Sequence, residues 1–433
     1  MRSARTKSHA RRARARKSLS LIGRLGPGLV TGAADDDPSG IATYSQAGAR
    51  FGYGLLWSVL FTTPLMIGIQ TVSARIGRIS GRGLAANIRE QFPRPLLYFV
   101  VLLLVVANVI NIAADLGAMG EALKLLVGGR SGLYVVLFAA VSLLLQIFIP
   151  FPKYAPILKW LTLVLFAYVA TVFVVHVPFD ALKQTLVPRA SLSAEYVSTL
   201  VAVLGTTISP YLFFWQASQE VEEQRAAPGA EPLKDAPAQA PSNLRRIDLD
   251  TLIGMILSNL IAFCIMLTTA VTLHAAGVTE IETSAQAASA LRPLAGDFAF
   301  FLFAAGIVGT GMLAVPVLAG SAAYAVAETL RWPIGLGLSP SRGRGFYSIL
   351  SVATLLGVAI DFTGIDAIQA LFWAAVINGV ISVPIMAVMM VLAARPAVMG
   401  RFVIARRLKL LGWLATAVMG AAVLAMLALY AAR

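Results

Sequence analysis

Charged residues are scarce in this chain of 433 residues. Asp, Glu, Lys and Arg together occupy 13% of the positions, while 58% are hydrophobic and the mean hydropathy is +0.79. A soluble domain carries roughly twice that charged fraction. The apolar residues also come in runs of about 18 or more, which is long enough for helices that cross a bilayer. The composition therefore excludes a soluble globular protein and predicts an all-α integral membrane protein with several spans.

Cysteine and histidine are also rare. The single cysteine, Cys264, lies within an apolar run, which excludes a disulfide framework and a cysteine-based metal site. The three histidines, His9, His176 and His274, are far apart and lack the spacing of metal ligands. No HExxH, GxSxG or paired His/Asp pattern occurs in an apolar segment, which argues against a membrane-embedded enzyme such as a protease. We therefore expect no catalytic residues and no cofactor.

The charge that is present is mostly basic, with 35 Lys and Arg against 21 Asp and Glu. A basic excess can indicate a nucleic-acid partner. Here the basic residues fall in short connections between apolar segments, where they set orientation and meet anionic lipid headgroups, so we expect the bilayer as partner and no nucleic acid. Alternate connections carry 28 and 7 of the 35. This bias predicts a multi-pass protein of a bacterial-type inner (plasma) membrane, with a basic cytoplasmic tail at 1–20 and an external C-terminus.

The apolar segments predict about eleven transmembrane helices. Their approximate extents are 21–50, 53–74, 96–126, 131–150, 154–178, 196–219, 247–274, 297–329, 346–361, 366–394 and 410–431. The first, sixth, eighth and tenth segments are interrupted by Gly, Pro or polar residues. The connection at 221–246 is rich in Pro, Ala and small polar residues, which is typical of a flexible linker, here on the cytoplasmic side.

Two of the interrupted segments correspond to each other. The first reads GPGLVTGAADDDPSGIATYSQAG and the sixth reads VAVLGTTISPYLFFWQASQ, each with a proline near its middle after small and polar residues. They lie five segments apart, so we expect two five-helix repeats of opposite orientation, at 21–178 and 196–394, and an additional helix at 410–431. Corresponding broken helices in inverted halves point to a midplane binding site in secondary transporters.

Three consecutive aspartates, Asp35, Asp36 and Asp37, fall within the first segment. A carboxylate at the bilayer centre costs about 2.5–3.5 kcal/mol on insertion scales, so each one needs a compensating partner. The alternative is that the helix starts after Gly40, but the Gly- and Ala-rich stretch before the aspartates is long enough for a half-helix. Pro38 interrupts the hydrogen-bond ladder and frees carbonyl groups beside Asp37. A carboxylate beside free carbonyls predicts a site for a hard cation.

The order of these motifs resembles the Nramp divalent-metal transporters. GPG and then Asp-Pro-small-small stand in the first segment, and Gly-Thr-Thr-Ile-Ser-Pro-Tyr stands in the sixth. The resemblance covers nearly the whole chain and implies a LeuT-like inverted repeat of 5+5 helices plus one, with helices 1 and 6 broken. In the family, a DPGN motif supplies an Asp and an Asn to the metal, and Ala-x-x-Met-Pro-His supplies a carbonyl and a thioether. The metal cation would be the substrate and not a cofactor.

Carried onto this sequence, the resemblance retains the aspartate as Asp37 but places Gly40 at the asparagine. The carbonyl donor becomes Thr206, the thioether position is Ser209, and the histidine position is Tyr211. The soft ligand is thereby lost, and carboxylate, carbonyl and water oxygens suit Mg²⁺, Ca²⁺ and Mn²⁺. The smaller side chains also leave space for a partly hydrated ion such as Mg²⁺. The chain is therefore similar to a divergent branch, the Nramp-related magnesium transporters.

An alternative is that neighbouring side chains refill this space and restore ordinary Mn²⁺ handling. Tyr211 is one candidate, and Gln369 near the start of the tenth segment is another. The amide oxygen of Gln369 can reach the ion if the helix is suitably placed, but the same side chain can also cap or bridge helices. Glu220, Glu222 and Glu223 follow the sixth segment, where a solvated helix end is favoured over a gate formed with loop arginines.

Polar residues in the third segment form one helical face. Asn108, Asn111 and Asp115 are spaced i, i+3 and i+7. The resemblance implies an acidic proton pathway here with the pattern Asp-Leu-Ala-Glu, but this chain has Ala118 in place of the glutamate. We expect these three residues, together with Asp36, to form a proton pathway or to support the ligands of the ion. Interhelical hydrogen bonding is the alternative for the two asparagines.

The sequence therefore predicts a secondary transporter that carries Mg²⁺ and/or Mn²⁺ into the cytoplasm by alternating access, without strict proton coupling. One alternative is a proton-coupled Mn²⁺/Fe²⁺ symporter of the Nramp type, with protons as a second substrate. The other is a non-transporting membrane sensor of the same fold. The oligomeric state is left open by the sequence.

Overall fold

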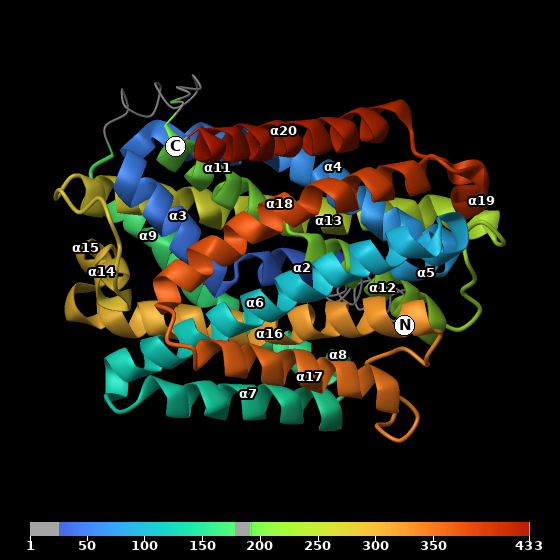
Figure 1. The fold of residues 1–433 in the computed structure, drawn as a ribbon, viewed down its shortest axis with the longest axis horizontal. Helices are drawn as coiled ribbons and strands as arrows, with labels where there is room; N and C mark the ends of the chain where they lie inside the picture. The colour runs from blue at the N-terminus through green and yellow to red at the C-terminus, as the bar shows by residue number, and fades with distance from the viewer. Residues whose placement is uncertain (1–25, 178–190, 192, 433) are drawn as a thin grey trace, which may run out of the picture.

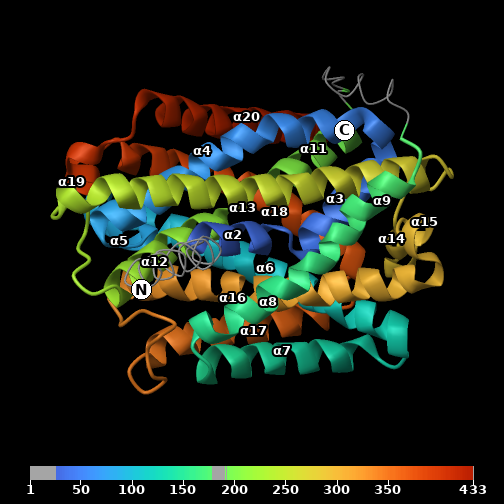
Figure 2. The ribbon, with the colours of Figure 1, turned by 180° about the vertical axis from the view of Figure 1, so that it is seen from behind.

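A computed structural model describes residues 26–177, 191 and 193–432. The predicted basic tail at 1–20 lies outside these ranges. Within them, all regular secondary structure is helical, and the long helices lie side by side along the long axis of the molecule (Figures 1 and 2). The all-α fold expected from the composition is therefore confirmed.

The predicted membrane segments form the long helices of this bundle. In chain order these helices are α2 (Pro27–Asp35), α3 (Pro38–Phe51), α4 (Leu56–Ser80), α6 (Arg94–Val127), α7 (Ser131–Phe148), α8 (Phe151–Leu161), α9 (Phe166–Val174), α11 (Ala194–Thr207), α12 (Pro210–Ala226), α13 (Ala240–Thr269), α16 (Ala299–Leu330), α17 (Arg344–Asp361), α18 (Ala367–Ala393) and α20 (Arg406–Ala431). Tight 3-10 turns link two pairs of them: η2 (Gly52–Leu55) joins α3 to α4, and η3 (Thr162–Leu165) joins α8 to α9. A wider π-helical turn, η5 (Ala270–His274), extends α13.

Nine helical stretches in the described residues are long and apolar enough to cross a membrane. One of them, Pro38–Ser80, combines α3 and α4, which the sequence predicts as parts of two segments. The fifth predicted segment is built from the shorter helices α8 and α9. Each of the eleven predicted segments therefore contains helix, although not every one is a single long helix.

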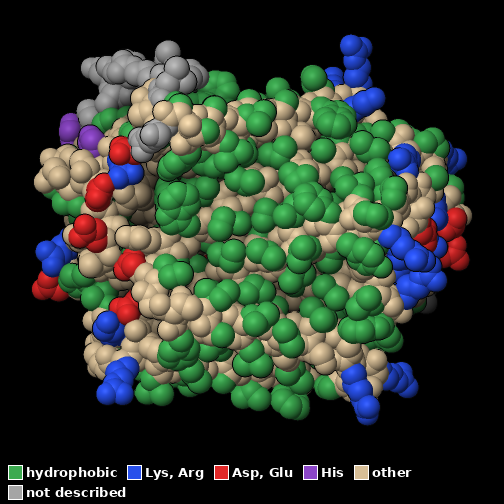
Figure 3. Space-filling view, viewed as in Figure 1, with side chains coloured by type: hydrophobic (Ala, Val, Ile, Leu, Met, Phe, Trp, Pro, Cys, Tyr) green, Lys and Arg blue, Asp and Glu red, His purple; other side chains and the backbone are tan. Residues whose placement is uncertain are grey.

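Short helices and connections gather at the two ends of the bundle. One end carries α14 (Ser284–Ser289) and α15 (Arg292–Ala295), and we call it the α14 end. The opposite end carries α5 (Leu84–Gln91) and α19 (Pro396–Met399), and we call it the α5 end. Figure 3 shows charged side chains at both ends and hydrophobic side chains over the middle.

Large apolar side chains are exposed over the middle of the bundle. Leu424 of α20 is 69% exposed, Leu102 of α6 61% and Leu355 of α17 57%. A soluble protein rarely exposes a wide contiguous apolar surface, because water penalises it. Lipid tails carry no such penalty, so this belt agrees with a multi-pass membrane protein.

Two of the four interrupted segments are broken helices, as the sequence predicts for helices 1 and 6. The first segment divides into α2 and α3, and the sixth divides into α11 and α12. The Gly, Pro and polar residues of the eighth and tenth segments do not break the helix: α16 continues through Pro316 and α18 continues through Pro384. A proline inside a membrane helix is tolerated where neighbouring groups satisfy the backbone that it frees.

The predicted flexible linker at 221–246 also differs from the structure. Helix α12 extends into it from one side and α13 from the other, so that only a short connection remains. That connection packs on the bundle: Leu233 is fully buried, and the backbone amides of Leu233 and Lys234 donate to the carbonyls of Arg78 and Ile79 at 3.3 and 3.2 Å. Its Pro and Ala content therefore reflects a packed turn and not a free chain.

The half-helix α2 is held closely against α13. A β-carbon added at Gly254 would lie 3.1 Å from the Cα atom of Leu29 and would press on the carbonyl of Gly28. Small residues allow such close approach of helices in membranes. This packing positions the end of α2, and with it the aspartate cluster, beside the middle of α13.

Candidate metal-ion site

The first break is centred on Asp37. Helix α2 ends at Asp35, and α3 begins at Pro38 with Asp37 as its N-cap in an extended conformation. The carboxylate of Asp37 accepts a hydrogen bond from the backbone amide of Gly40 at 2.8 Å. Aspartate at the N-cap and proline at the first helical position both favour a helix start. The predicted break at Asp37-Pro38 is therefore confirmed, and Asp37 is 1% exposed.

The second break has a different pattern of hydrogen bonds. Ser209 precedes Pro210 at the start of α12, but its hydroxyl does not cap that helix. Instead it donates back to the carbonyls of Gly205 and Thr206, at 2.8 and 2.9 Å. The carbonyl of Ile208 accepts from the Ser382 hydroxyl of α18 at 2.8 Å. The carbonyls freed by the break are thus satisfied by serine side chains.

Tyr211 joins the two breaks. Its hydroxyl lies 3.1 Å from a carboxylate oxygen of Asp37 and 2.9 Å from the carbonyl oxygen of Ala34 in α2. Both partners are acceptors, and the single hydroxyl proton is shared between them. Tyr211 is fully buried, so this contact is shielded from solvent. Tyr211, which stands where the family motif has a histidine, therefore contacts Asp37 directly.

The space expected beside Asp37 is closed in this conformation. A β-carbon at Gly40 would lie 3.2 Å from the Thr206 hydroxyl and 3.3 Å from the carbonyl oxygen of Asp35, so even a small side chain would be crowded. Thr206 and Ser209 are 1% and 2% exposed. The expected room for a hydrated ion is absent at Gly40, because the Thr206 hydroxyl, the Asp35 carbonyl and the Tyr44 ring lie close to this residue. Any ion here would replace existing hydrogen bonds between protein groups.

Asp36 turns away from the break and toward α13. Its carboxylate lies 3.1 Å from the hydroxyl of Ser258, which also lies 2.5 Å from the carboxylate of Asp35. Both carboxylates are at most 3% exposed. Sequence reasoning missed Ser258, because a serine in a long apolar helix carries no pattern that links it to aspartates more than 200 positions earlier.

Asp115 faces the first break from α6. It is fully buried, and it interacts electrostatically with Asp37, with Tyr211 and with the backbone amide of Ser39 at the start of α3. It is therefore the one member of the predicted polar face of α6 that reaches the site.

The two asparagines of that face hold helices together. Asn108 donates to the carbonyl of Leu318 at 2.9 Å and to the Ser321 hydroxyl at 2.6 Å, both on α16. The side chains of Asn111 and Asn378 exchange hydrogen bonds of 3.0 and 3.2 Å between α6 and α18. These contacts match the alternative of interhelical hydrogen bonding.

Gln369 is not brought to the site. Its side chain is exposed in the first turn of α18, and its backbone amide donates to the Asp366 carboxylate at 3.0 Å. Of the predicted ion-binding residues, the structure brings together Asp37, Gly40, Thr206, Ser209 and Tyr211 and leaves Gln369 apart.

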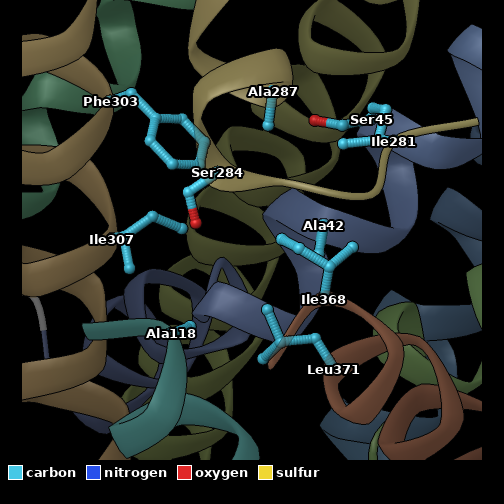
Figure 4. A pocket seen from close by; sticks show the side chains of 10 residues that line it. All are labelled: Ala42, Ser45, Ala118, Ile281, Ser284, Ala287, Phe303, Ile307, Ile368 and Leu371. Carbon is cyan, nitrogen blue, oxygen red and sulfur yellow. The ribbon is translucent and has the colours of Figure 1, made fainter. Parts of the chain in front are cut away.

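Two cavities lie between the α14 end and the site. The larger has a volume of about 330 Å³ and is lined by the carboxylates of Glu121, Glu282, Asp361 and Asp366. The smaller, of about 10 Å³, lies deeper and shares Ser284 and Ile368 with the larger one. Its lining is shown in Figure 4 and comprises Ala42, Ser45, Ala118, Ile281, Ser284, Ala287, Phe303, Ile307, Ile368 and Leu371. A volume of 10 Å³ is about enough for one water molecule, so a hydrated cation cannot pass.

Ion pairs close the α5 end. Arg246 of α13 contacts the carboxylates of Glu220 at 2.5 Å and Glu223 at 3.1 Å. Glu222 accepts hydrogen bonds from the Tyr324 hydroxyl and from the Leu336 amide. The favoured prediction of a solvated helix end is therefore wrong for Glu220, which is fully buried and pairs with an arginine that belongs to α13 and not to a loop.

Asp250 secures α2 at the same end. Its carboxylate accepts hydrogen bonds from the backbone amides of Gly26, Gly28 and Leu29 at 3.0, 2.7 and 3.2 Å. The first amides of a helix have no partner within it, and the N-cap residue Gly26 has no side chain to supply one. Asp250 therefore caps α2 from another helix.

Within the described parts of the chain, no group of three His, Cys, Asp or Glu side chains is arranged to hold a metal ion. A cation between the two breaks would therefore depend on carbonyl and hydroxyl oxygens as well as on carboxylates. This donor set matches the one inferred from the sequence and suits hard cations.

Comparison with known proteins identifies the family. A profile of the natural resistance-associated macrophage protein-like family (Nramp) matches residues 28–429, which is most of the chain. This chain belongs to the Nramp family. It is 30% identical over 319 residues to a protein of Klebsiella pneumoniae named divalent metal cation transporter MntH, covering 72% of this chain and 73% of that one. The protein of the same name from Erwinia tasmaniensis is 29% identical over 296 residues, which are 66% of this chain and 68% of that one.

Solved structures agree on the fold. The manganese transporter of Eremococcus coleocola aligns with a TM-score of 0.71 at 20% identity, over 94% of this chain and 86% of that one. Mhp1, a nucleobase-cation-symport-1 family transporter, aligns with a TM-score of 0.55 at 12% identity, over 93% and 92% of the two chains. The LeuT-like fold implied by the resemblance is confirmed. Nramp proteins are transporters, so this chain is a transporter and not an enzyme.

Replacing Asp250 by alanine should loosen α2. The substitution removes three hydrogen bonds to a charged acceptor, and each such bond contributes about 1.5–3 kcal/mol. We expect amide hydrogen exchange across α2 to become at least about tenfold faster, measured by mass spectrometry on the purified protein. Asp248→Ala is the matched control, because its half-exposed carboxylate pairs only with Arg75 and such surface pairs contribute little. Equal exchange in the two variants would contradict the capping role.

Proposed function

We propose that this Nramp protein carries a divalent metal cation, Mg²⁺ or Mn²⁺, across the membrane by alternating access. The observation that carries the proposal is the buried carboxylate of Asp37, which stands at one helix break and is joined through Tyr211 to the other. Relatives of similar sequence are named divalent metal cation transporters. A buried carboxylate at a midplane break is the arrangement expected for a cation substrate.

The ion would be held by oxygen atoms that form hydrogen bonds with one another in this conformation. Asp37 supplies charge, and the Tyr211 hydroxyl already contacts it at 3.1 Å. The carbonyl of Thr206 is occupied by the Ser209 hydroxyl at 2.9 Å, and rotation of that hydroxyl frees the carbonyl for the ion. Gly40 keeps α3 and α11 close enough for both sides of the site to reach one cation. Binding therefore exchanges internal hydrogen bonds for ion–oxygen contacts.

Selectivity would follow from the type of ligand. A serine at position 209 offers a hard oxygen where the family motif offers a thioether, and hard ligands favour Mg²⁺ and Mn²⁺ over softer ions such as Cd²⁺. Mg²⁺ keeps several of its waters in proteins. Since the site is closed around Gly40 in this conformation, we place any retained water on the side of the cavities at the α14 end.

The orientation follows from the distribution of charge. We place the α5 end in the cytoplasm of a bacterial-type plasma membrane, because the connections at that end carry most of the Lys and Arg residues. The C-terminus then lies outside. In this arrangement α2 to α9 form the first repeat, α11 to α18 form the second, and α20 is the additional helix. The transporter would take the cation from the acidic cavity outside and release it inside.

Asp37→Ala should abolish uptake of Mg²⁺ and Mn²⁺ into proteoliposomes, because it removes the charged ligand. The protein should still fold, since the N-cap contributes only about 1 kcal/mol. Asp235→Ala is the control, because Asp235 is exposed in the connection between α12 and α13, away from both breaks. Uptake by Asp37→Ala at the rate of the control would remove Asp37 from the site.

Ser209→Met should shift selectivity toward soft ions. We expect the ratio of Cd²⁺ to Mg²⁺ uptake to rise about tenfold, which corresponds to about 1.4 kcal/mol. Ser209→Ala is the matched variant, since it also removes the hydroxyl that bonds the Thr206 carbonyl but adds no sulfur. The same ratio in both variants would mean that position 209 does not face the ion.

Uptake should proceed without a stoichiometric proton flux, because Tyr211 and Ala118 stand where the family motifs have histidine and glutamate. We propose that the membrane potential drives the cation inward. A pH-sensitive dye inside proteoliposomes should report no acidification beyond empty liposomes while Mn²⁺ enters. Acidification that follows Mn²⁺ influx and vanishes in Asp37→Ala would instead indicate a proton-coupled symporter.

A further inference from the structure

Asp115 differs from the other buried carboxylates in its lack of partners. Each of the others in the described parts of the chain accepts at least one hydrogen bond: Asp35, Asp36, Asp37, Glu220, Asp250 and Glu328. Neither oxygen of Asp115 accepts a well-aligned hydrogen bond, although the residue is fully buried. No ion pair with Lys or Arg is formed by Asp115 in the described structure. A buried carboxylate without a partner is costly, so this position calls for a ligand.

The surroundings of Asp115 point to a cation. From α6 it interacts with Asp37 and Tyr211, and with the amide of Ser39 in the first turn of α3. Two carboxylates on different helices thus face the same break. The packing of α6 agrees with this placement. Met119, one turn further along α6, and Pro38, the first residue of α3, both lie next to Gly311 of α16. A divalent ion between Asp37 and Asp115 would neutralise both charges.

Asp115 also lies on the way from the cavities to Asp37. Ala118 on α6 and Ala42 on α3 both line the smaller cavity (Figure 4). Asp115 and Ser39 stand three residues before them, which is about one helical turn or 5 Å deeper. Towards the α14 end, Gly117 and Glu121 of the same helix line the larger cavity. Helix α6 therefore runs from the acidic cavity, past the smaller cavity, to Asp115.

We propose that Asp115 is a second carboxylate ligand, which receives the cation from the cavity at the α14 end and shares it with Asp37. This inference rests on the proposed function. Mg²⁺ and Mn²⁺ sites commonly use one or two carboxylates together with neutral oxygens. The second carboxylate compensates for the asparagine and thioether that Gly40 and Ser209 do not supply.

A purely structural role of Asp115 must be distinguished from the proposed role as a metal ligand. A carboxylate near the start of α3 also interacts favourably with the helix dipole, and it can accept from the Ser39 amide. Asp115→Asn keeps the size of the side chain and an acceptor oxygen but removes the charge. The variant therefore preserves a structural contact with the amide and weakens a metal ligand.

The test is equilibrium binding of Mn²⁺ to the purified full-length protein in detergent, by calorimetry at a fixed pH. We expect Asp115→Asn to raise the Kd at least about tenfold with an unchanged melting temperature, and Asp37→Ala to abolish binding. Asp297→Asn makes the same chemical change at an exposed position and should bind as the wild type does. Asp115→Glu, which keeps the charge, should bind more tightly than Asp115→Asn.

The outcomes separate the two claims. Mn²⁺ binding that Asp37→Ala abolishes but Asp115→Asn leaves within twofold of wild type overturns the inference and keeps the proposed function. A wild-type protein that neither binds nor transports Mn²⁺ or Mg²⁺ overturns both. If Asp115→Asn fails to fold, Asp115→Glu decides, because moving the carboxylate by one methylene must change the Kd of a direct ligand by more than twofold.

Discussion

The bilayer offers no hydrogen bonds, so every polar group exposed by the two helix breaks must find a partner inside the protein. The rest of the site follows from this constraint. The carbonyls freed near Pro210 accept from Ser209 and from α18, and the carboxylate of Asp37 accepts from its own helix and from Tyr211. These oxygens are the donors that a hard cation requires. In this conformation the site is therefore a set of internal hydrogen bonds, which ion binding would replace.

Closure differs at the two ends of the molecule. At the α14 end, an apolar layer around Ala42 and Ala118 separates a large acidic cavity from the site. At the α5 end, the half-helix α2 is tied by Asp250, and Arg246 pairs with carboxylates of α12. The layer at the first end is mainly apolar, whereas the contacts at the second end involve charged groups. Alternating access in the LeuT-like fold would require the α14 end and the α5 end to open one at a time.

The sequence predicted the features that depend on local chemistry. Proline after Asp37 and after Ser209 indicated the two helix breaks, because proline lacks a backbone donor and favours the first position of a helix. A proline alone does not determine a break, since α16 continues through Pro316. Partners such as Ser258 for Asp36 lie far away in the chain and carry no local signal. The same limit applies to the exposed position of Gln369, which depends on where α18 begins in space.

The central claim is that the two breaks form one oxygen-lined cation site. Anomalous scattering from crystals grown with Mn²⁺ tests it most directly, because it locates the ion without assumptions about transport. We expect a peak within about 2–2.6 Å of the Asp37 carboxylate and the Thr206 carbonyl, the range of bonds from hard cations to oxygen. A peak at Asp35, Asp36 and Ser258, with none beside Asp37, would contradict it.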